Sequence, residues 1–251
     1  MNTRVLITGA SSGLGAGMAK AFAARGCDLV LTARRLELLE KVKAEIEQQS
    51  PGRRVLMHQL DVTDHDAVFE VFAKSAAEMG GLDRIVVNAG IGKGGRVGSG
   101  RFAANRDTAL TNFIAGIAQC EAAMELFYRQ GTGHLVVMSS VTAGRGLPGP
   151  MNVYAATKAA LAHLAEGIRS DVKAKQVPIK VSTIRPGYIE SEMQDRTGKR
   201  HPLLVEASAG AASLVRAIER EVEDACVPWW PWTFFELVLR FAPDSLVKRI
   251  L

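Results

Sequence analysis

A tyrosine and a lysine stand four residues apart in the stretch YAATK, from Tyr154 to Lys158. In a helix this spacing places both side chains on one face. A free phenol has a pKa of about 10, which is too high for a base at neutral pH, and a neighbouring ammonium group favours the phenolate. The pair is therefore either an ordinary amphipathic feature or a phenol prepared for proton transfer. Catalysis would need a cofactor, an orienting partner and a pocket from elsewhere in the chain.

A glycine-rich turn near the N-terminus predicts a site for a pyrophosphate. The stretch TGASSGLG (8–15) follows a short apolar segment, opens a helical one and has the spacing G-x-x-x-G-x-G. Glycines let backbone N–H groups approach phosphate oxygens closely, and the helix N-terminus attracts their negative charge. A tight turn that binds no ligand is the alternative. The residues predicted to contact the phosphates are Gly9, Ser11, Ser12, Gly13, Leu14 and Gly15.

The end of the second apolar segment predicts which dinucleotide binds. It reads TARR, with Ala33 where a carboxylate would bind the ribose 2′-hydroxyl of NAD. Arg34 and Arg35 follow, and two guanidinium groups suit a 2′-phosphate, which they bind through charge-assisted bidentate hydrogen bonds. The pattern favours NADP(H). A helix start whose arginines face solvent is the alternative.

Apolar and amphipathic segments alternate along the chain, and they must position these groups. The apolar segments are short and rich in Val, Leu and Ile, which is typical of parallel strands covered by helices on both faces. Repeated βα units predict one doubly wound sheet with right-handed crossovers. The expected strands are 4–9, 28–33, 54–60, 84–90, 133–140 and 179–187. The expected helices are 13–25, 36–49, 64–80, 107–130 and 152–175.

Together with NAG (88–90), SS (139–140) and RPG (185–187), these motifs resemble the short-chain dehydrogenase/reductase family over about residues 3–195. Each motif alone is common, but their combination in this order is specific. The resemblance implies a single-domain α/β Rossmann fold with a mainly parallel sheet of six to seven strands. It also implies an NADP(H)-dependent enzyme that transfers a hydride between the nicotinamide and a carbonyl or secondary alcohol. The four catalytic residues that it implies are Asn112, Ser140, Tyr154 and Lys158.

The resemblance also implies a role for each of the four. Tyr154 would donate a proton during reduction and accept one during oxidation, while Ser140 would bind the substrate oxygen. Lys158 would favour the phenolate of Tyr154 and bind the nicotinamide ribose, and Asn112 would hold a water that links Lys158 to solvent. Ser140 precedes Tyr154 by 14 positions, one more than is usual in the family. Ser139 is one position farther away, so Ser140 is the predicted active serine and Ser139 a structural one. A serine that merely caps the strand end is the alternative for Ser140.

Motif positions predict the remaining cofactor contacts. Asp61 and Val62 would flank the adenine, residues 88–90 the ribose and pyrophosphate, and residues 186–191 the carboxamide. A helix cap is the alternative role for Asp61. Besides Arg34, Arg35, Tyr154 and Lys158, the predicted contacts are Asp61, Val62, Asn88, Ala89, Gly90, Pro186, Gly187, Ile189 and Ser191.

Two segments should frame the substrate, namely the loop 141–151 and the substrate-side segment 188–206. Their candidate pocket residues indicate an apolar or lipid-like small molecule. These residues are Val141, Leu147, Met151, Tyr188 and Met193. The glycine-rich loop 92–101 is either a lid or a disordered connection.

The composition limits the other possibilities. Hydrophobic residues make up 47% of the 251 residues and charged residues 23%, which is typical of a globular protein. Neither a signal peptide nor an apolar span of roughly 20 residues is visible, so we expect a cytoplasmic protein. The three cysteines lie far apart without metal-ligand spacing, which predicts buried thiols and no metal site. The net charge of +5 comes without a dense basic run, so no nucleic-acid partner is predicted.

The C-terminal end departs from the family pattern. We treat 1–251 as one domain in which 229–251 is an apolar C-terminal extension. It opens with the stretch VPWWPW (227–232), whose prolines restrict any strand here to an edge or a very short piece. This end resembles that of hydroxysteroid-dehydrogenase-like members. It would pack on a sister subunit, cover the substrate cleft or lie on a lipid surface, in that order of preference.

The sequence also bears on the oligomeric state and on whether the protein is an enzyme. The resemblance implies that the helices 107–130 and 152–175 pair across a two-fold axis, which predicts a homodimer or homotetramer. A non-catalytic NADP-binding sensor or scaffold on the same fold is the main alternative function, but it would not need the four catalytic residues together. An epimerase or dehydratase of the longer family branch is disfavoured, because 251 residues leave little room for its larger C-terminal domain.

Overall fold

The computed structural model describes residues 2–190 and 203–241. It contains one seven-stranded sheet of order β3-β2-β1-β4-β5-β6-β7, in which all neighbouring strands are parallel. This confirms the predicted α/β fold. The strands are β1 (Arg4–Thr8), β2 (Asp28–Ala33), β3 (Val55–Gln59), β4 (Arg84–Val87), β5 (Gly133–Met138), β6 (Ile179–Pro186) and β7 (Asp224–Val227).

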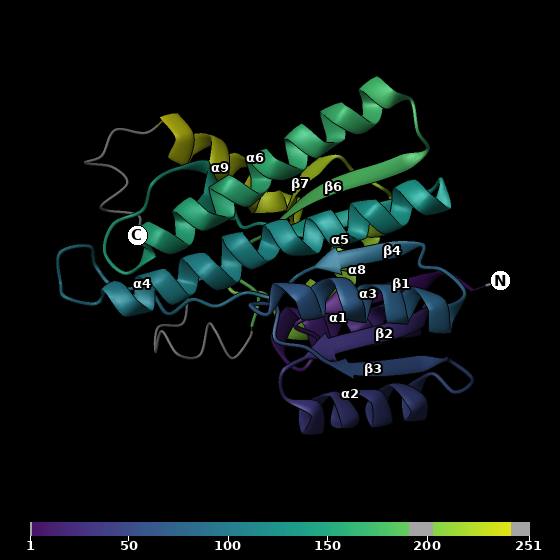
Figure 1. Ribbon diagram of the computed structural model, residues 1–251. Helices are drawn as coiled ribbons and strands as arrows, with labels where there is room; N and C mark the ends of the chain where they lie inside the picture. Colours follow the sequence, from purple (N-terminus) through teal and green to yellow (C-terminus); the bar gives the residue numbers. More distant parts are fainter. Residues whose placement is uncertain (1, 191–202, 242–251) are drawn as a thin grey trace.

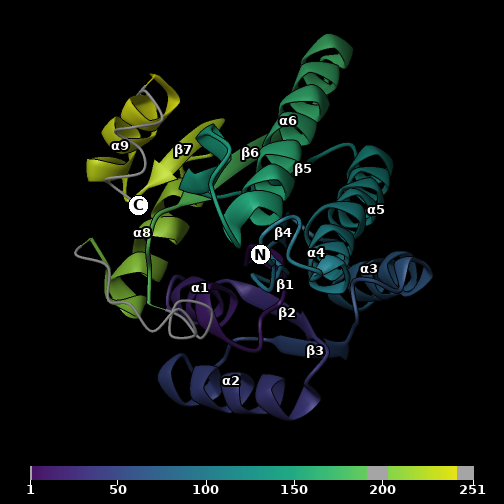
Figure 2. The same ribbon diagram turned by 90° about the vertical axis from the view of Figure 1, so that its left-hand side faces the viewer.

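Helices cover both faces of the sheet (Figures 1 and 2). One apolar core joins the sheet to α1, α2 and α8, and a second core joins it to α3, α5 and α6. The helix α9 lies beside β7 at the edge of the sheet, as Figure 2 shows. The helices are α1 (Gly13–Ala23), α2 (Leu36–Gln49), α3 (His65–Met79), α4 (Phe102–Ala109), α5 (Ala115–Gln130), α6 (Met151–Lys175), α8 (Ala207–Glu219) and α9 (Trp229–Phe241).

Strand β1 illustrates why the strands are apolar on both sides. Successive side chains of a strand point to opposite faces of the sheet. Val5 and Ile7 accordingly belong to the core under α1, whereas Leu6 belongs to the core under α3 and α5. Each of the three residues is fully buried, so all three positions require an apolar side chain.

The strand order places a crevice at the carboxyl end of the sheet. Strand β1 pairs with β2 on one side and with β4 on the other, so the connections diverge between β1 and β4. In open parallel sheets, ligands bind beyond the carboxyl ends of the strands where the strand order reverses. The glycine-rich turn after β1 and the NAG stretch after β4 both lie at this point.

The structure corrects several predicted boundaries. The helix predicted over 107–130 begins at Phe102 and is interrupted by a π-helical turn at Leu110–Ile114. The loop 92–101 is held at its centre, where the amide of Gly95 donates to Asn105 Oδ1 at 2.8 Å. Strand β5 ends at Met138, two residues early, because Ser140 caps the 3-10 turn Val141–Gly144.

No helix or strand was expected after residue 187. The structure adds α8, the edge strand β7 and α9 there, and β7 is as short as the following prolines predict. The three cysteines are buried and form no disulfide, as expected. None of the helices described is both long and apolar enough to cross a membrane.

Candidate active site

The turn after β1 presents a bare helix N-terminus. Ser12 occupies the N-cap position of α1, but its side chain makes no cap hydrogen bond, and the first turn contains no acidic residue. Gly9 and Gly13 have φ angles of +66° and +53°, which other residues adopt at a cost. A Cβ at position 15 would lie 2.2 Å from the carbonyl oxygen of Gly9. Gly15 therefore packs directly on Gly9, and no side chain at these positions covers the N–H groups at the helix end.

These features fit the phosphates of a dinucleotide. The first N–H groups of α1 lack intrahelical partners, and the positive end of the helix dipole stabilises a negative charge. Arg35 reaches this turn, since its Nη2 lies 3.3 Å from Ser12 Oγ. The residues predicted from the glycine motif are thus gathered at one helix end, together with a guanidinium group from the end of β2.

Arg34 lies at the neighbouring cleft beyond β2 and β3. Its Nη1 is 3.8 Å from Asp61 Oδ2, and both side chains are largely exposed. Asp61 Oδ1 accepts hydrogen bonds from the amide and the hydroxyl of Thr63. The N-cap of α3 is Asp64, whose Oδ1 accepts from the amide of Ala67, so Asp61 is not the helix cap. Arg34 and Asp61 line a cleft of about 360 Å³.

The NAG stretch after β4 is hydrogen-bonded to the end of β1. Asn88 Nδ2 donates to the carbonyl oxygen of Thr8 at 2.8 Å, and the hydroxyl of Thr8 accepts from the amides of Asn88 and Ala89. The side chain of Asn88 therefore holds the glycine-rich turn in place. Gly90 lies beside two catalytic candidates, because a Cβ there would be 3.2 Å from Asn112 Oδ1 and 3.5 Å from Lys158 Nζ.

The two serines after β5 do different work. Ser139 Oγ donates to the carbonyl oxygen of Lys158 at 2.7 Å, which is the structural role predicted for it. Ser140 Oγ accepts from the amide of Thr142 at 3.2 Å and from its hydroxyl at 2.9 Å. Two incoming donors leave the hydroxyl proton of Ser140 available to another acceptor.

Lys158 is buried in the centre of the site. It is 5% exposed, and its Nζ donates to the carbonyl oxygen of Met138 at 2.7 Å. Burial penalises the charged form, so the pKa of Lys158 is lowered to about 8. The ammonium group is still mostly charged at neutral pH.

Tyr154 differs from the expectation that its pKa is lowered. Burial raises the pKa of Tyr154, and a hydrogen bond with Ser140 opposes that effect without cancelling it. The nearby phenol of Tyr188 raises the pKa further. The ammonium group of Lys158 is directed at Met138, so the expected lowering by Lys158 does not dominate. Among the protein's own groups, the arrangement keeps Tyr154 protonated at neutral pH.

Asn112 lies at the π-helical turn between α4 and α5. It is 1% exposed, and its amide group binds both the N–H and the carbonyl oxygen of Ile91. Its Nδ2 also lies 3.3 Å from Thr157 Oγ1, which donates to the carbonyl oxygen of Tyr154. Interruptions of this kind are frequent at functional sites. Sequence reasoning missed Thr157, although its place immediately before Lys158 was the available signal.

The segment after β6 is only partly described. The amide of Gly187 donates to the carbonyl oxygen of Val227, and Tyr188 lies close enough to Tyr154 to influence its pKa. The side chain of Ile189 is 4% exposed and packs where a Cβ of Gly210 would be, so it faces the core. Two predicted contacts, Ser191 and Met193, lie outside the described residues.

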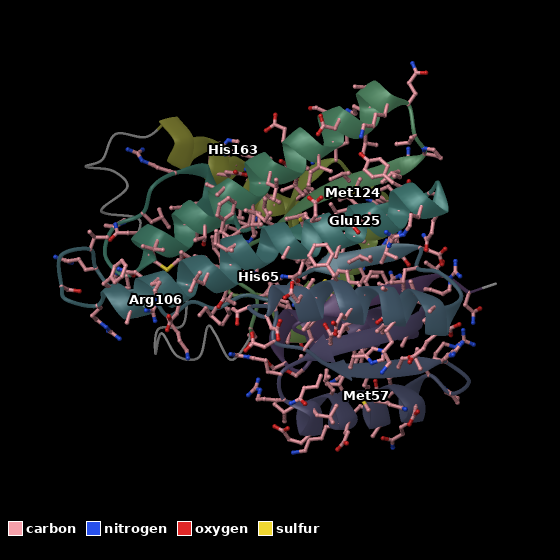
Figure 3. The ribbon with its side chains drawn as sticks, viewed as in Figure 1. Met57, His65, Arg106, Met124, Glu125 and His163 are labelled. Carbon is pink, nitrogen blue, oxygen red and sulfur yellow. The ribbon has the colours of Figure 1, made fainter. Side chains whose placement is uncertain are left out.

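The predicted apolar pocket residues are more deeply buried than a binding surface requires. Val141 and Leu147 are 3% and 4% exposed, whereas Met151 and Tyr188 are half-buried. Val141 packs against Trp232 of α9, a residue that sequence reasoning placed only in an apolar extension. His163 on α6, labelled in Figure 3, is exposed.

Comparisons with known proteins agree with this arrangement. The family model described as short chain dehydrogenase matches residues 3–202. An uncharacterized oxidoreductase of Mycobacterium tuberculosis is 48% identical over 246 residues, which cover 98% of this chain and 96% of the relative. A hydroxysteroid 11-beta-dehydrogenase 1-like protein of Xenopus tropicalis is 31% identical, over 99% of this chain and 87% of that protein.

A solved structure shows the same fold with a bound dinucleotide. It is a short-chain dehydrogenase from Sphingobium yanoikuyae in complex with NADPH. The two chains are 28% identical and superpose with a TM-score of 0.82, over 99% of this chain and 96% of the other.

Proposed function

The chain belongs to the short-chain dehydrogenase family, whose members are oxidoreductases, and from this premise we propose that it is an NADPH-dependent carbonyl reductase. The observation that carries the proposal is the cluster at the carboxyl end of β5. Ser140, Tyr154 and Lys158 meet there, one strand away from the bare helix end that suits a pyrophosphate. A non-catalytic binding protein would have no use for a phenol, a hydroxyl and a buried ammonium group in one place.

The residues divide the chemistry between them. NADPH, when bound, supplies the hydride. Ser140 donates a hydrogen bond to the carbonyl oxygen of the substrate and so holds it beside Tyr154. Tyr154 transfers its phenolic proton to that oxygen as negative charge develops there, and the raised pKa of Tyr154 favours this direction because the phenol is protonated beforehand. Lys158 would stabilise the phenolate that results, since it is one helical turn from Tyr154 on α6 and its charge is poorly solvated.

The preference for NADP(H) rests on the end of β2. Arg34 and Arg35 approach from two sides, one beside Asp61 and the other beside Ser12, and a 2′-phosphate placed between them would meet both guanidinium groups. The NADPH complex of the Sphingobium yanoikuyae relative supports this choice. Binding would divert Arg34 from Asp61, a partner that is exposed and therefore weakly held.

The substrate class is proposed to be an apolar ketone or aldehyde and the corresponding alcohol. Its support is the apolar character of the half-buried side chains nearby, Met151 at the start of α6 and Tyr188 after β6. The whole chain is proposed as one domain, with 188–206 on the substrate side and 229–251 as the C-terminal extension. Fold-family analogy alone does not identify a substrate, so the class follows from the side chains.

A homodimer or homotetramer is part of the proposal. Large apolar side chains on the α4–α5 helix pair remain 37–40% exposed, more than a solvent-facing helix needs. They are Leu110, Ile114 and Ile117. Figure 1 shows this pair running alongside α6. A second copy of the chain could therefore contact the α4–α5 pair and α6 together. Light scattering that gave a monodisperse monomer of 27.0 kDa would contradict this part.

The function is tested by a screen of NADPH oxidation against a panel of ketones and aldehydes of increasing apolar size. Turnover is expected with NADPH and at least one apolar carbonyl compound, and it should be far slower with NADH. Calorimetric titration of both reduced dinucleotides provides the binding control. Equal affinities for NADPH and NADH would contradict the assigned cofactor, and tight NADPH binding without turnover on any carbonyl would favour the sensor instead.

A further inference from the structure

The inner face of α9 is fixed to the loops that surround the catalytic cluster. Trp232 is fully buried and shares an apolar cluster with Val141 and Cys226. One turn later, Glu236 binds the guanidinium group of Arg185 and accepts from Cys226 Sγ at 2.8 Å. The buried ring of Trp232 and the ion pair of Glu236 with Arg185 together hold this helix in one position. The residues that pack on the helix are therefore held in place as well.

The ring of Trp232 lies directly on the chain after β6. A Cβ at position 187 would be 2.2 Å from Nε1 of Trp232, so no side chain fits between Gly187 and the indole. The next residue, Tyr188, meets the same indole edge to face, with ring centroids 5.1 Å apart and planes at 78°. On its other side, the amide of Gly187 is bound by the carbonyl oxygen of Val227. The backbone at 187–188 is therefore clamped between β7 and Trp232.

Two residues that pack with Trp232, Tyr188 and Val141, lie next to the proposed catalytic residues. Tyr188 is near enough to Tyr154 to raise the pKa of that phenol. Val141 follows Ser140 immediately and belongs to the same apolar cluster as the indole. Trp232 is therefore packed with a residue next to Ser140 in sequence and with a residue close to Tyr154 in space.

We infer that Trp232 is a positioning residue, which acts through Gly187 and Tyr188 to set the wall of the site where the carbonyl group and the nicotinamide end of NADPH meet. The inference rests on the proposed function, because that function places hydride transfer beside Tyr154. It assigns part of the specificity of the enzyme to α9. Displacements of about 1 Å at such a wall cost up to roughly 100-fold in rate, because the reacting atoms lose their alignment.

An exposed tryptophan of the same segment supplies a matched control. Trp230 is 62% exposed and contacts the rings of Trp229 and Phe234, which are exposed as well. Its backbone is not helical, so Trp230 lies at a kink within α9. Trp230→Leu and Trp232→Leu are therefore the same substitution two residues apart, one at an exposed ring and one at a buried ring. A general effect of removing an indole from this segment affects both variants, whereas loss of positioning affects Trp232→Leu alone.

The kinetic test compares these variants on the best carbonyl substrate. Trp232→Leu is expected to lower kcat/KM at least about tenfold, with a fall in kcat, because the wall moves and the reacting atoms lose their alignment. Trp232→Phe should recover most of the loss, and Trp230→Leu should match the unaltered protein. A Trp232→Leu variant that melts at a lower temperature but keeps KM and kcat would show a structural role and overturn the inference.

A binding test separates the two ends of the cofactor. Adenosine 2′,5′-bisphosphate has the 2′-phosphate but no nicotinamide, so its affinity reports the end near Arg34 and Arg35. Trp232→Leu is expected to weaken NADPH by about threefold or more and to leave the bisphosphate unchanged. Equal weakening of both ligands, or of neither, would contradict a role at the nicotinamide end.

Two further outcomes keep the inference separable from the proposed function. If Trp232→Leu does not fold, Trp232→Phe and Tyr188→Leu are combined, and their effects on kcat/KM should be non-additive because they share one contact. Additive effects would overturn the coupling. Retention of full turnover by Tyr154→Phe would contradict the proposed function whatever Trp232 does. An inactive Tyr154→Phe with unaltered Trp232 variants would contradict the positioning role alone.

Discussion

Two buried polar clusters lie on the same parallel sheet, one near the amino ends of β4 and β5 and the other at the carboxyl end of β5. In the first, Arg84 Nε donates to His134 Nδ1 at 2.9 Å, and His134 Nε2 lies 2.8 Å from Ser182 Oγ. Arg84 also stacks over the ring of Phe22. The second cluster is that of Ser140, Tyr154 and Lys158. Both contain charged or titratable groups within a few per cent of full burial.

The clusters differ in how completely their members satisfy one another. In the first, each ring nitrogen of His134 has a protein partner, and burial together with the charges of Arg84 and Lys180 lowers the pKa of His134 to about 3. The imidazole is therefore neutral at neutral pH, and the network is closed. In the second, Ser140 hydrogen-bonds Tyr154, whose side chain is only half-buried, so the network reaches the protein surface. An open network at the edge of a sheet is available to a ligand, whereas a closed one stabilises the fold.

The largest effect that distinguishes the clusters is expected from Tyr154→Phe. Turnover should fall about 10²- to 10⁴-fold, because the proton donor is lost, while the melting temperature should hardly change. Steady-state kinetics and thermal unfolding measure the two quantities. Tyr128→Phe on α5 removes the same atom from an exposed ring and should keep full turnover. A Tyr154→Phe enzyme as active as the Tyr128→Phe control would contradict the catalytic assignment.

The next largest effect is expected at Arg34, where the 2′-phosphate of NADPH is proposed to bind. Arg34→Asp should reduce the preference for NADPH over NADH by about 1.5–3 kcal/mol, because a 2′-phosphate would lose a charged partner and face a carboxylate. Calorimetric titration of both dinucleotides measures it, and Arg129→Asp, at an equally exposed arginine, is the control. An unaltered preference in Arg34→Asp would assign the 2′-phosphate to other residues.

Arg84→Ala should show the opposite signature from Tyr154→Phe. The free energy of unfolding is expected to fall by about 1–3 kcal/mol, because His134 Nδ1 loses its donor and Phe22 loses its cationic neighbour. The turnover of the folded enzyme should not change. Urea unfolding measures the first quantity, and Arg106→Ala, whose side chain is exposed on α4 (Figure 3), is the control. Lost turnover with intact stability would show that the first cluster is not merely structural.

The last effect concerns pH, and it is small close to pH 6.5. His134 has a folded pKa of about 3 and an unfolded one of 6.5, so the unfolded chain binds the extra proton between these values. Stability from this group is complete above pH 6.5 and is lost as the pH falls below it, by about 1.4 kcal/mol per unit. His134→Gln should have a shallower decline between pH 6.5 and 5. Parallel pH profiles of the free energy of unfolding for the two proteins would contradict the closed-network interpretation.

Much of the fold was predictable because its determinants are local. The alternation of Val5, Leu6 and Ile7 towards two cores requires only that each position be apolar, and such runs stand out along the chain. Gly9 and Gly13 predict a turn, because few other residues adopt positive φ angles such as theirs. Helix ends were less predictable. Arg101 precedes α4 without a side-chain cap, so the true start at Phe102 had no local signal.

The candidate site was predictable in its membership but not in its electrostatics. The motif spacing brought Ser140, Tyr154 and Lys158 to one place, and these assignments remain predictions that the variants above test. The pKa of Tyr154 was expected to fall because Lys158 is four residues away. Its rise follows from burial under distant parts of the chain, and the direction of Lys158 towards Met138 depends on how α6 packs on β5.

The sequence by itself determined β1 to β6, the glycine-rich turn and the types of the groups that meet at the carboxyl end of the sheet. These follow from residue type and short-range spacing, which act through backbone sterics and periodic burial. Only the tertiary structure decided which groups are desolvated, which hydrogen bonds close and that Trp232 lies on Gly187, 45 positions earlier in the chain. Burial and long-range contact depend on the packing of the whole chain, so no local pattern records them.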